Sequence, residues 1–355
     1  MEERDGFWKV LKQVAPGSPL REGLESILRA RTGALIVVGD SPQVMALVDG
    51  GFRLDCEFAP ASLYELAKMD GAIILTPDAR RILYANAMLV PDASIPTFET
   101  GTRHRTAERV AKQTGTLVIS ISQRRNLISL YKGNSRYVLR DISVILTKAN
   151  QALQTLEKYK AVLDQAVTNL SALELEDLVT VLDVVLVVQR TEMVLRIVTE
   201  IERYIFELGT EGRLVSMQLE ELVTNVAEEG MLIIRDYAQF VEGRTADQVR
   251  EQMAGWPHED LRDLLTIARV LGLGSAPGTL DNPAAPRGYR ILRKIPRLPM
   301  PVIENLVSHF GSLQQILRAS IEELDEVEGI GEVRARAIKE GLRRLREQIM
   351  LERHI

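Results

Sequence analysis

The sequence has very little cysteine and few aromatic residues. Cys56 is the only cysteine among 355 residues, so no disulfide can form within the chain and the fold cannot depend on oxidation. Aromatic residues make up 5% of the chain, whereas hydrophobic residues make up 46%, which predicts cores built mainly from aliphatic side chains. The chain is longer than one typical domain, so we expect two or three domains.

Long hydrophobic runs are also lacking. The longest apolar stretch, from Leu178 to Val188, contains Asp183 and is shorter than the ~20 residues that a membrane-spanning helix needs. The N-terminus, Met1 to Asp5, is charged and is followed by no apolar segment of the kind found in signal peptides. We therefore expect a cytoplasmic protein that has no membrane partner.

Proline is absent from the middle of the chain. No proline occurs from Thr97 to Trp256, while seven of the 14 prolines precede this stretch and the other seven lie between Pro257 and Pro301. This distribution predicts a loop-rich first domain, a long helical middle, and a Gly- and Pro-rich linker that leads to a small third domain. The boundaries we expect are residues 1–147, 148–288 and 289–355.

Charge is distributed unevenly along the chain. Residues 287–355 carry 13 Lys and Arg against 10 Asp and Glu, a net charge of +3, so the rest of the chain carries −8 of the total of −5. A basic end on an acidic body indicates that a polyanionic partner would bind at the C-terminal end.

The first domain alternates short apolar runs with helical segments. The runs 33–39, 71–76 and 117–122 are typical of buried strands, and residues 126–132 and 136–140 suggest the two arms of a hairpin around Gly133 and Asn134. Residues 61–69 and 106–113 have the pattern of helices. Strands separated by helices predict an α/β domain with a mixed, largely buried sheet.

The middle of the chain has a helical period. Leu156, Leu163 and Leu170 are seven residues apart, and the same spacing links Tyr159, Ala166 and Leu173. This is the pattern of a packed helix, and further helical pattern follows at 179–198 and 214–222. We expect an all-α bundle or spine that has an architectural role.

Three clusters of residues in the first domain could carry chemistry. In the first, Asp70 stands where a helix ends and a strand begins, and Gly71 and Ala72 follow it. Glycine lets the backbone approach a ligand closely, and the carboxylate could hold a divalent cation or orient a hydroxyl group. An Asp-Gly turn is also common in any protein, and taken alone this interpretation is the better one.

The second cluster is Thr102-Arg103-His104-Arg105-Thr106, which follows Gly101. Hydroxyl groups, guanidinium groups and the free N–H groups of a helix that begins at Thr106 would together bind phosphate. A solvent-exposed basic turn that only caps a helix is the alternative. The chain contains no G-x-x-x-x-G-K-[ST] loop, so this is a phosphate site of another kind.

The third cluster, Ser122, Gln123, Arg124 and Arg125, ends a predicted strand. Ligands of α/β sheets bind outside the carboxyl ends of strands, but an ordinary charged loop is the better interpretation of these residues taken alone.

The first two clusters together resemble the signatures of the diadenylate cyclase family. Asp70-Gly71-Ala72 and Arg103-His104-Arg105 stand at a spacing that fits this family. The whole chain is similar to the branch of the family that scans DNA integrity, which joins a cyclase domain, a helical spine and a C-terminal helix–hairpin–helix domain. In that branch Gln123 is replaced in some relatives by a basic residue.

The resemblance implies an activity and a set of site residues. Two cyclase domains would meet face to face, each with one ATP, and form cyclic di-AMP and two pyrophosphates with Mg²⁺ or Mn²⁺ as cofactor. Asp70 would serve the attacking 3′-hydroxyl directly or through the metal ion, and Arg103, His104 and Arg105 would surround the triphosphate as catalytic residues. The remaining ATP-binding residues implied are Gly71, Leu89, Thr102, Thr106, Ser122, Arg124 and Arg125.

The C-terminal segment contains Gly329-Ile330-Gly331, which resembles a helix–hairpin–helix motif. The two glycines would let backbone N–H groups face a phosphate at the start of a helix. Arg336, Lys339 and Arg343 recur on one face of that helix, and Arg334 lies nearby. Such contacts hold the DNA backbone without reading bases. A preceding unit, Ile295 to Phe310, lacks the Gly-x-Gly pattern, and we expect it to be mainly structural.

We therefore predict a nucleoid-associated diadenylate cyclase that binds ATP and DNA, including branched structures such as Holliday junctions. The resemblance implies a homo-oligomer, at least a dimer and by precedent an octamer. The first alternative is a non-enzymatic DNA-binding scaffold whose nucleotide domain senses ATP. A second alternative, a ligase, is disfavoured because the chain has no lysine motif suited to a covalent nucleotide intermediate.

Overall fold

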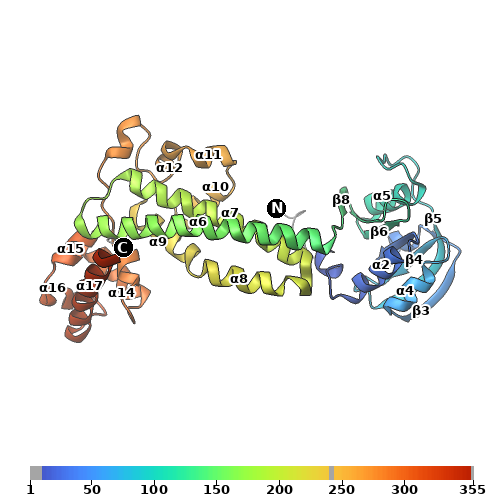
Figure 1. Ribbon diagram of the computed structural model, residues 1–355, viewed down its shortest axis with the longest axis horizontal. Coiled ribbons are helices and arrows are strands. Elements are labelled where there is room, and N and C mark those ends of the chain that lie inside the picture. The colour runs from blue at the N-terminus through green and yellow to red at the C-terminus, as the bar shows by residue number, and fades with distance from the viewer. Residues whose placement is uncertain (1–9, 240–243, 353–355) are drawn as a thin grey trace. The chain divides into compact units, whose positions relative to one another are not determined.

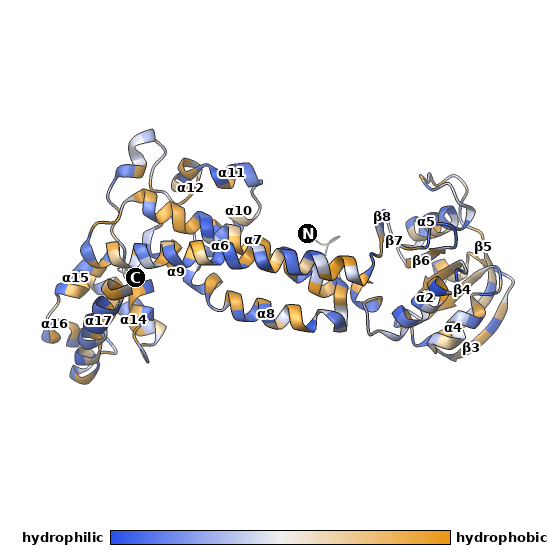
Figure 2. Cartoon of the chain, viewed as in Figure 1, coloured by the Kyte–Doolittle hydropathy of each residue, from blue (hydrophilic) through white to orange (hydrophobic). Residues whose placement is uncertain are grey.

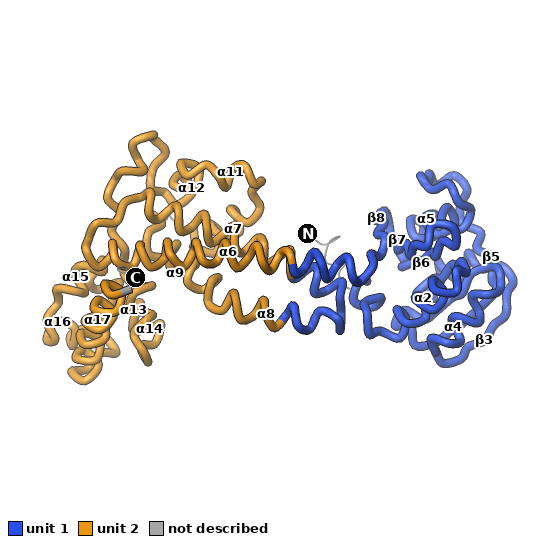
Figure 3. The backbone as a smooth tube through the Cα atoms, in the orientation of Figure 1, with its two compact units in different colours: residues 1–150, 202–216 blue, residues 151–201, 217–355 orange. Residues whose placement is uncertain are grey.

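The computed structural model describes residues 10–239 and 244–352 (Figure 1) and divides into two compact units. Unit 1 comprises residues 1–150 and 202–216, and unit 2 comprises residues 151–201 and 217–355 (Figure 3). The charged Met1–Asp5 segment lies outside the described residues. Within the described part of the chain, no helix combines the length and the apolar character that crossing a membrane requires.

Unit 1 is built on one mixed sheet, as the sequence predicts. The strand order is β2-β5-β4-β1-β6-β7-β8, with β3 paired to β5. Only β1 and β4 run parallel; the other pairs are antiparallel. The strands are β1 (Ala34–Val38), β2 (Val48–Asp49), β3 (Phe52–Glu57), β4 (Ala72–Leu75), β5 (Arg81–Leu89), β6 (Leu117–Ser122), β7 (Leu127–Lys132) and β8 (Ser135–Val138).

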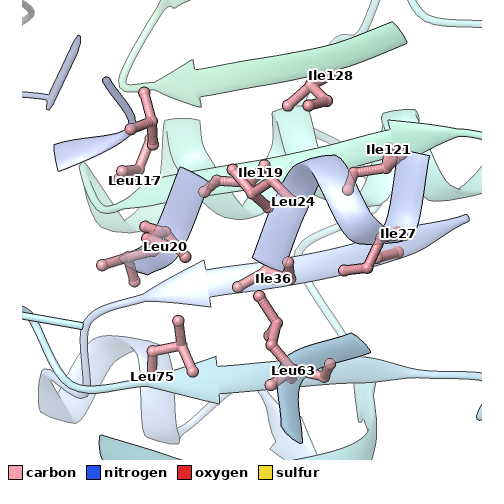
Figure 4. Close-up of a cluster of buried hydrophobic side chains, with 14 of the residues drawn as sticks. Leu20, Leu24, Ile27, Ile36, Leu63, Leu75, Leu117, Ile119, Ile121 and Ile128 are labelled. Carbon is pink, nitrogen blue, oxygen red and sulfur yellow. The ribbon is translucent and has the colours of Figure 1, made fainter. Parts of the chain in front are cut away.

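Helices cover both faces of this sheet. One core packs Leu20, Leu24 and Ile27 of α2 (Pro19–Arg29) and Leu63 of α4 (Pro60–Leu66) against strand residues such as Ile36 and Ile119 (Figure 4). The other core packs α3 (Pro42–Met45) and α5 (Thr102–Thr114) against the alternate strand residues, including Val37 and Val118. Because both faces are covered, every residue of β1 is buried.

The start of α5 differs from the sequence prediction. The helix begins at Thr102, with Gly101 in the extended N-cap position, and not at Thr106. The Thr106 hydroxyl donates to the Thr102 carbonyl oxygen one turn earlier, so it caps nothing. The Thr102–Thr106 cluster is therefore the first turn of a helix, and not a loop in front of one.

Long helices follow the sheet domain, as the heptad spacing predicts. They are α6 (Ile142–Glu176), α7 (Val181–Leu208), η1 (Gly209–Gly212), α8 (Arg213–Val223) and α9 (Val226–Tyr237). Hydrophobic and hydrophilic positions alternate along α6 and α7 (Figure 2). Leu156, Leu163 and Leu170 are buried, but Tyr159 is 40% exposed, so only the first of the two heptad rows lies wholly in the core.

The Gly- and Pro-rich segment after Trp256 is folded, in contrast to the predicted linker. It follows α10 (Ala246–Ala254) and contains α11 (His258–Arg262), α12 (Leu264–Val270) and η2 (Pro277–Asp281). Ile267 and Leu271 are fully buried. The Val181 N–H donates to the Asn282 carbonyl at 2.9 Å, which ties the segment to the start of α7. Turn residues here connect short helices that share the core of unit 2.

The C-terminal helices form a separate small core. They are α13 (Tyr289–Arg293), α14 (Met300–Phe310), α15 (Leu313–Arg318), α16 (Ile321–Asp325) and α17 (Glu332–Glu352). The first unit was predicted from Ile295, but its first helix is α13, and Ile295 lies in the turn that follows. Ile338, Leu342 and Ile349 form the buried face of α17.

A buried ionic network joins α13 to α9 and α6. The Asp236 carboxylate, at the end of α9, accepts the N–H groups of Gly288 at 2.7 Å, Tyr289 at 2.7 Å and Arg290 at 3.0 Å. The Arg290 guanidinium is 1% exposed and pairs with Glu174 of α6. Burial, with the neighbouring Glu174 charge, raises the pKa of Asp236 to about 7, although the backbone donors and Arg290 act in the opposite direction.

Candidate functional site

A cavity of about 780 Å³ opens in unit 1 beside the first turn of α5. Its volume falls in the usual range for small-molecule sites. Five chain segments supply its walls: the start of β1, the start of β4, the end of β5, the 99–106 segment and the turn between β6 and β7. The lining residues are Leu35, Gly71, Ala72, Ala87, Met88, Leu89, Glu99, Thr100, Gly101, Thr102, Arg103, His104, Thr106, Ser122, Gln123, Arg124 and Arg125.

One wall of the cavity is apolar and depends on a glycine. Gly71 has φ of +92°, and a Cβ atom there would lie 2.8 Å from the Asn86 backbone carbon. The Asn86 amide donates to the Asp70 carbonyl at 2.7 Å, so the turn into β4 is held against β5. Ala72 is paired with Ala87 of β5, and together with Leu89 they form an apolar surface of the cavity on which a flat ring could pack.

The opposite wall is the N-terminus of α5. Gly101 provides no side-chain cap, and the first turn contains no acidic residue. The first N–H groups of a helix have no partner within the helix and favour an anion. The α5 terminus therefore faces the cavity with backbone donors and the positive end of the helix dipole.

The segment before α5 is held against this helix by hydrogen bonds to side chains of α5. Glu108 accepts the Thr97 hydroxyl at 2.5 Å and the Phe98 N–H at 3.2 Å. Arg109 and Lys112 donate to the carbonyls of Ile95 at 3.0 Å and Pro96 at 2.8 Å. These bonds fix the approach to Gly101 and hence the position of the open helix terminus.

Arginine side chains make the site cationic. Arg103, Arg124 and Arg125 all line the cavity. The Arg103 guanidinium lies against Gly33, because a Cβ atom built on Gly33 would coincide with it. Guanidinium groups bind phosphate oxygens in pairs of hydrogen bonds, so this end of the cavity suits a polyphosphate.

His104 takes part in a chain of hydrogen bonds that the sequence did not predict. Its Nδ1 atom lies 3.0 Å from the Tyr131 hydroxyl, which donates to Glu99 Oε1 at 2.8 Å. Arg136 Nε reaches the same Glu99 oxygen at 2.9 Å. His104 Nε2 is buried and has no hydrogen-bond partner within the described chain. Burial is the main cause that lowers the pKa of His104.

Most of the predicted nucleotide residues meet in this cavity, and two do not. Gly71, Leu89, Thr102, Arg103, His104, Thr106, Ser122, Arg124 and Arg125 line it, whereas Asp70 and Arg105 are exposed outside the lining. Residues two apart on a helix face opposite ways, so Arg103 and Arg105 cannot both turn into one cavity. Asp70 borders the cavity through its neighbour Gly71.

The site also occupies a different sheet edge from the one expected. Ser122 and Leu89 do end their strands, but Leu35 and Ala72 lie at the amino ends of the parallel pair β1 and β4. Antiparallel neighbours bring strand starts and strand ends to one edge, so the rule for parallel sheets applies only in part.

The described residues include no group of three or more His, Cys, Asp or Glu side chains that could hold a metal ion by itself. The exposed Asp70 carboxylate at the cavity edge fits a different kind of site. Mg²⁺ is commonly held by one or two carboxylates together with substrate phosphates.

The C-terminal helices contain two hairpins of the same geometry. In the second hairpin, Gly329 has φ of +84°, the next residue, Ile330, is buried, and Gly331 follows it. In the first hairpin, the corresponding residues are Arg297 with φ of +61°, the buried Leu298, and Pro299. Proline has no N–H group, so only the second hairpin presents a backbone donor at this position.

The predicted basic face of α17 is largely engaged within the chain. Lys339 Nζ donates to the carbonyls of Leu317 at 3.0 Å and Ala319 at 2.6 Å, so it caps α15. Arg336 pairs with Glu332, and Arg343 pairs with Glu340 and Glu347. Helical spacing shows which residues share a face, but it does not reveal the acidic neighbours or the nearby helix end that they contact.

Three family profiles match consecutive parts of the chain. The DisA bacterial checkpoint controller nucleotide-binding family matches residues 21–136, and the DisA bacterial checkpoint controller linker region matches residues 139–280. A SAM-like helix–hairpin–helix tandem matches residues 302–344. The cavity lies within the first match and the Gly329–Gly331 hairpin within the third.

Full-length relatives support the same assignment. The chain is 73% identical to the DNA integrity scanning protein DisA of Symbiobacterium thermophilum over 100% of both chains. It is 63% identical to the protein of the same name from Carboxydothermus hydrogenoformans, over 95% of this chain and 96% of the relative. Among solved structures, DacA from Staphylococcus aureus aligns with 40% of the chain at 18% identity and a TM-score of 0.29, a likeness too low to support an argument.

Proposed function

The chain belongs to the DisA family of bacterial checkpoint controllers, and on that premise we propose that it condenses two ATP molecules into cyclic di-AMP. Each 3′-hydroxyl oxygen forms a bond to the α-phosphorus of the other ATP, and the bond between the α-phosphorus and the bridging oxygen breaks. Two pyrophosphates leave. The observation that carries the proposal is the cavity that joins an apolar wall, an open helix terminus and three arginines.

The residues of one chain divide the work of binding. Ala72 and Leu89 would pack against the adenine, while the α5 terminus and Thr102 would bind the phosphates. Arg103, Arg124 and Arg125 would neutralise the charge that shifts to the leaving pyrophosphate. Phosphoryl transfer depends mainly on positioning and on charge stabilisation, and this donor set supplies both.

Asp70 and Arg105 would act across the interface between two chains. Both are exposed and lie outside the cavity of their own chain. Facing a second cavity, Asp70 would orient the 3′-hydroxyl and accept its proton. A divalent cation, Mg²⁺ or Mn²⁺, held by Asp70 and the phosphates, would supply additional charge neutralisation. The active form would be at least a dimer, and an octamer is the larger assembly we propose.

The reaction is tested by incubating the full-length protein with ATP and either metal ion and separating the products by chromatography. We expect cyclic di-AMP and pyrophosphate, and we expect Asp70→Asn to abolish product while ATP still binds. Asp164→Asn, at an exposed position of α6 outside the cavity, is the matched control and should stay active. ATP binding with no product in either metal would favour the alternative, an ATP-sensing scaffold.

We also propose that the Gly329–Gly331 hairpin binds DNA, in particular branched DNA, in the nucleoid. The free N–H groups at the start of α17, with Arg334, Arg336 and Arg343, would hold backbone phosphates. Fluorescence anisotropy with a four-way junction and a duplex of equal length tests the preference. Equal affinity for both would contradict it, and cyclase activity measured with and without the junction gives the sign of any coupling.

A further inference from the structure

The hydrogen-bond chain behind His104 determines which ring nitrogen is left without a partner. The Tyr131 hydroxyl has a single proton, and it points to the Glu99 carboxylate at 2.8 Å. Arg136 is paired with the same oxygen and keeps Glu99 an acceptor. The Tyr131 oxygen can therefore only accept from His104, so Nδ1 carries a hydrogen in the neutral and in the charged ring.

Nε2 is consequently the nitrogen that remains for a ligand. It is buried, has no partner within the described chain, and belongs to a side chain that lines the cavity. A buried polar atom without a partner is costly and marks a place where a ligand completes the bonding. In the charged ring Nε2 carries a hydrogen as well, and a phosphate oxygen there would accept it.

The charges around the ring come from four elements. Arg103 on α5, Arg125 in the β6–β7 turn and Arg136 on β8 lower the pKa of His104, as does burial, whereas Glu99 before α5 raises it. Tyr131 on β7 stays protonated, because burial and Glu99 raise its pKa. Glu99 thus supplies the negative charge that supports a protonated His104, and Tyr131 connects the two.

We propose that Tyr131 and Glu99 are positioning residues of the cyclase reaction, which hold His104 with Nε2 directed at the phosphates of ATP. The proposal rests on the proposed function and adds residues that lie 27 and five positions from His104 in the sequence. In this arrangement the charged ring donates Nε2–H to a phosphate oxygen, and its orientation is fixed before ATP arrives. Preorganised donors of this kind are effective because they need no rearrangement during the reaction.

A double-mutant cycle separates positioning from a structural role. We expect Tyr131→Phe to lower kcat about tenfold or more, since a misplaced catalytic group can cost up to ~100-fold, with a much smaller change in KM. In a His104→Asn background the same change should cost nothing, because there is no imidazole left to orient. An equal loss in both backgrounds would show that Tyr131 only supports the fold and would overturn the proposal.

Tyr84→Phe is the matched control, since Tyr84 packs in the same core cluster as Tyr131 but lies outside the cavity lining. It should retain wild-type kcat. Measuring the wild-type protein in the same experiment distinguishes the cyclase proposal from the positioning proposal. A wild type that forms no product refutes the cyclase function. An active wild type together with an equally active Tyr131→Phe variant refutes only the positioning role of Tyr131.

Glu99→Gln gives a second, independent measurement. The amide keeps the shape of Glu99 and an oxygen that can accept from Tyr131, but it removes the charge that raises the pKa of His104. We expect the pH–kcat profile to move toward lower pH and activity to recover partly on acidification. A profile that keeps its position would contradict the link between Glu99 and His104, even if His104→Asn proves too slow to measure.

Discussion

At the scale of single residues, two glycines at the site stand where other atoms occupy the space that a side chain would need. Gly71 has a positive φ and no room for a Cβ atom, whereas Gly33 has an ordinary φ, and the atoms nearest to a Cβ there belong to the flexible Arg103 guanidinium. A methyl group at position 33 would therefore displace the Arg103 side chain, which we propose binds phosphate, and leave the backbone in place.

Gly33→Ala should weaken ATP binding without unfolding the protein. The flexible end of Arg103 must move aside, which removes a charge-assisted hydrogen bond to phosphate, a contact worth about 1.5–3 kcal/mol. We expect KM for ATP to rise about tenfold or more, with a melting temperature close to wild type. Gly278→Ala, which enters open space in η2, is the control; an unchanged KM in Gly33→Ala would contradict the placement of Arg103.

The cavity residues were predictable where they are adjacent in the sequence. Arg103 and His104 stand together in one cluster, and so do Arg124 and Arg125. Glu99, Tyr131 and Arg136 were missed because they come from a loop and two strands, and only the folded sheet brings them to His104. The signal in the sequence was slight: an acidic residue, Glu99, three positions before Thr102.

At the scale of elements, buried strands were predicted well and irregular ones poorly. β1, β4 and β6 are apolar runs that lie within the residues expected. β5 was missed because its pairing with β4 shifts register twice and Asn86 adopts a left-handed conformation, which interrupts the alternation of side chains. The α5 start was misplaced because Gly101 leaves the first turn without a side-chain cap that a sequence pattern could reveal.

The two C-terminal hairpins allow a test of backbone recognition. Gly331→Pro removes one N–H group, and Pro299 occupies the corresponding place in the first hairpin, so we expect the fold to tolerate it. DNA affinity should fall on the order of tenfold, while the salt dependence stays the same because no cation is lost. Gly331→Ala keeps the N–H group and enters open space. Equal affinity of both variants would exclude this amide from the DNA contact.

The Asp236 network gives the C-terminal helices a pH-dependent stability. The pKa of Asp236 is raised from 3.8 to about 7 in the folded protein, so the folded state binds the proton more tightly than the unfolded state. The tighter proton binding by the folded state adds on the order of 4 kcal/mol to the free energy of unfolding below pH ~4. This contribution is lost as the pH rises to ~7.

Asp236→Asn removes this titration. Thermal unfolding followed between pH 4 and pH 8 should show the wild type losing stability relative to the variant as the pH rises. Two curves that remain parallel across this range would contradict the raised pKa of Asp236.

At the scale of the whole molecule, the proposed function gives each chain half of a reaction centre. We propose that the cavity of one chain binds one nucleotide, while Asp70 and Arg105 lie outside that cavity. The resemblance implied two facing domains, but the two short motifs could not reveal which of their residues lie outside the cavity of their own chain. In the proposed mechanism the second half comes from another chain, so activity should depend on assembly.

Adding inactive Asp70→Asn chains to the wild type should lower its specific activity after the two have been mixed and allowed to exchange subunits. A mixed pair retains one Asp70, so only one of the two phosphodiester bonds should form readily and a linear dinucleotide should accumulate. Wild-type activity that is unaffected by excess variant, once exchange is verified by mass measurement of tagged chains, would contradict a shared centre.

The most direct test of the account is to chromatograph the products of ATP over a dilution series of the full-length protein, with the assembly state measured at each concentration. We predict cyclic di-AMP and pyrophosphate as products, and a specific activity that falls as the assemblies dissociate into single chains. Cyclic di-AMP formed at undiminished specific activity by single chains, or ATP bound without any cyclic product, would contradict it.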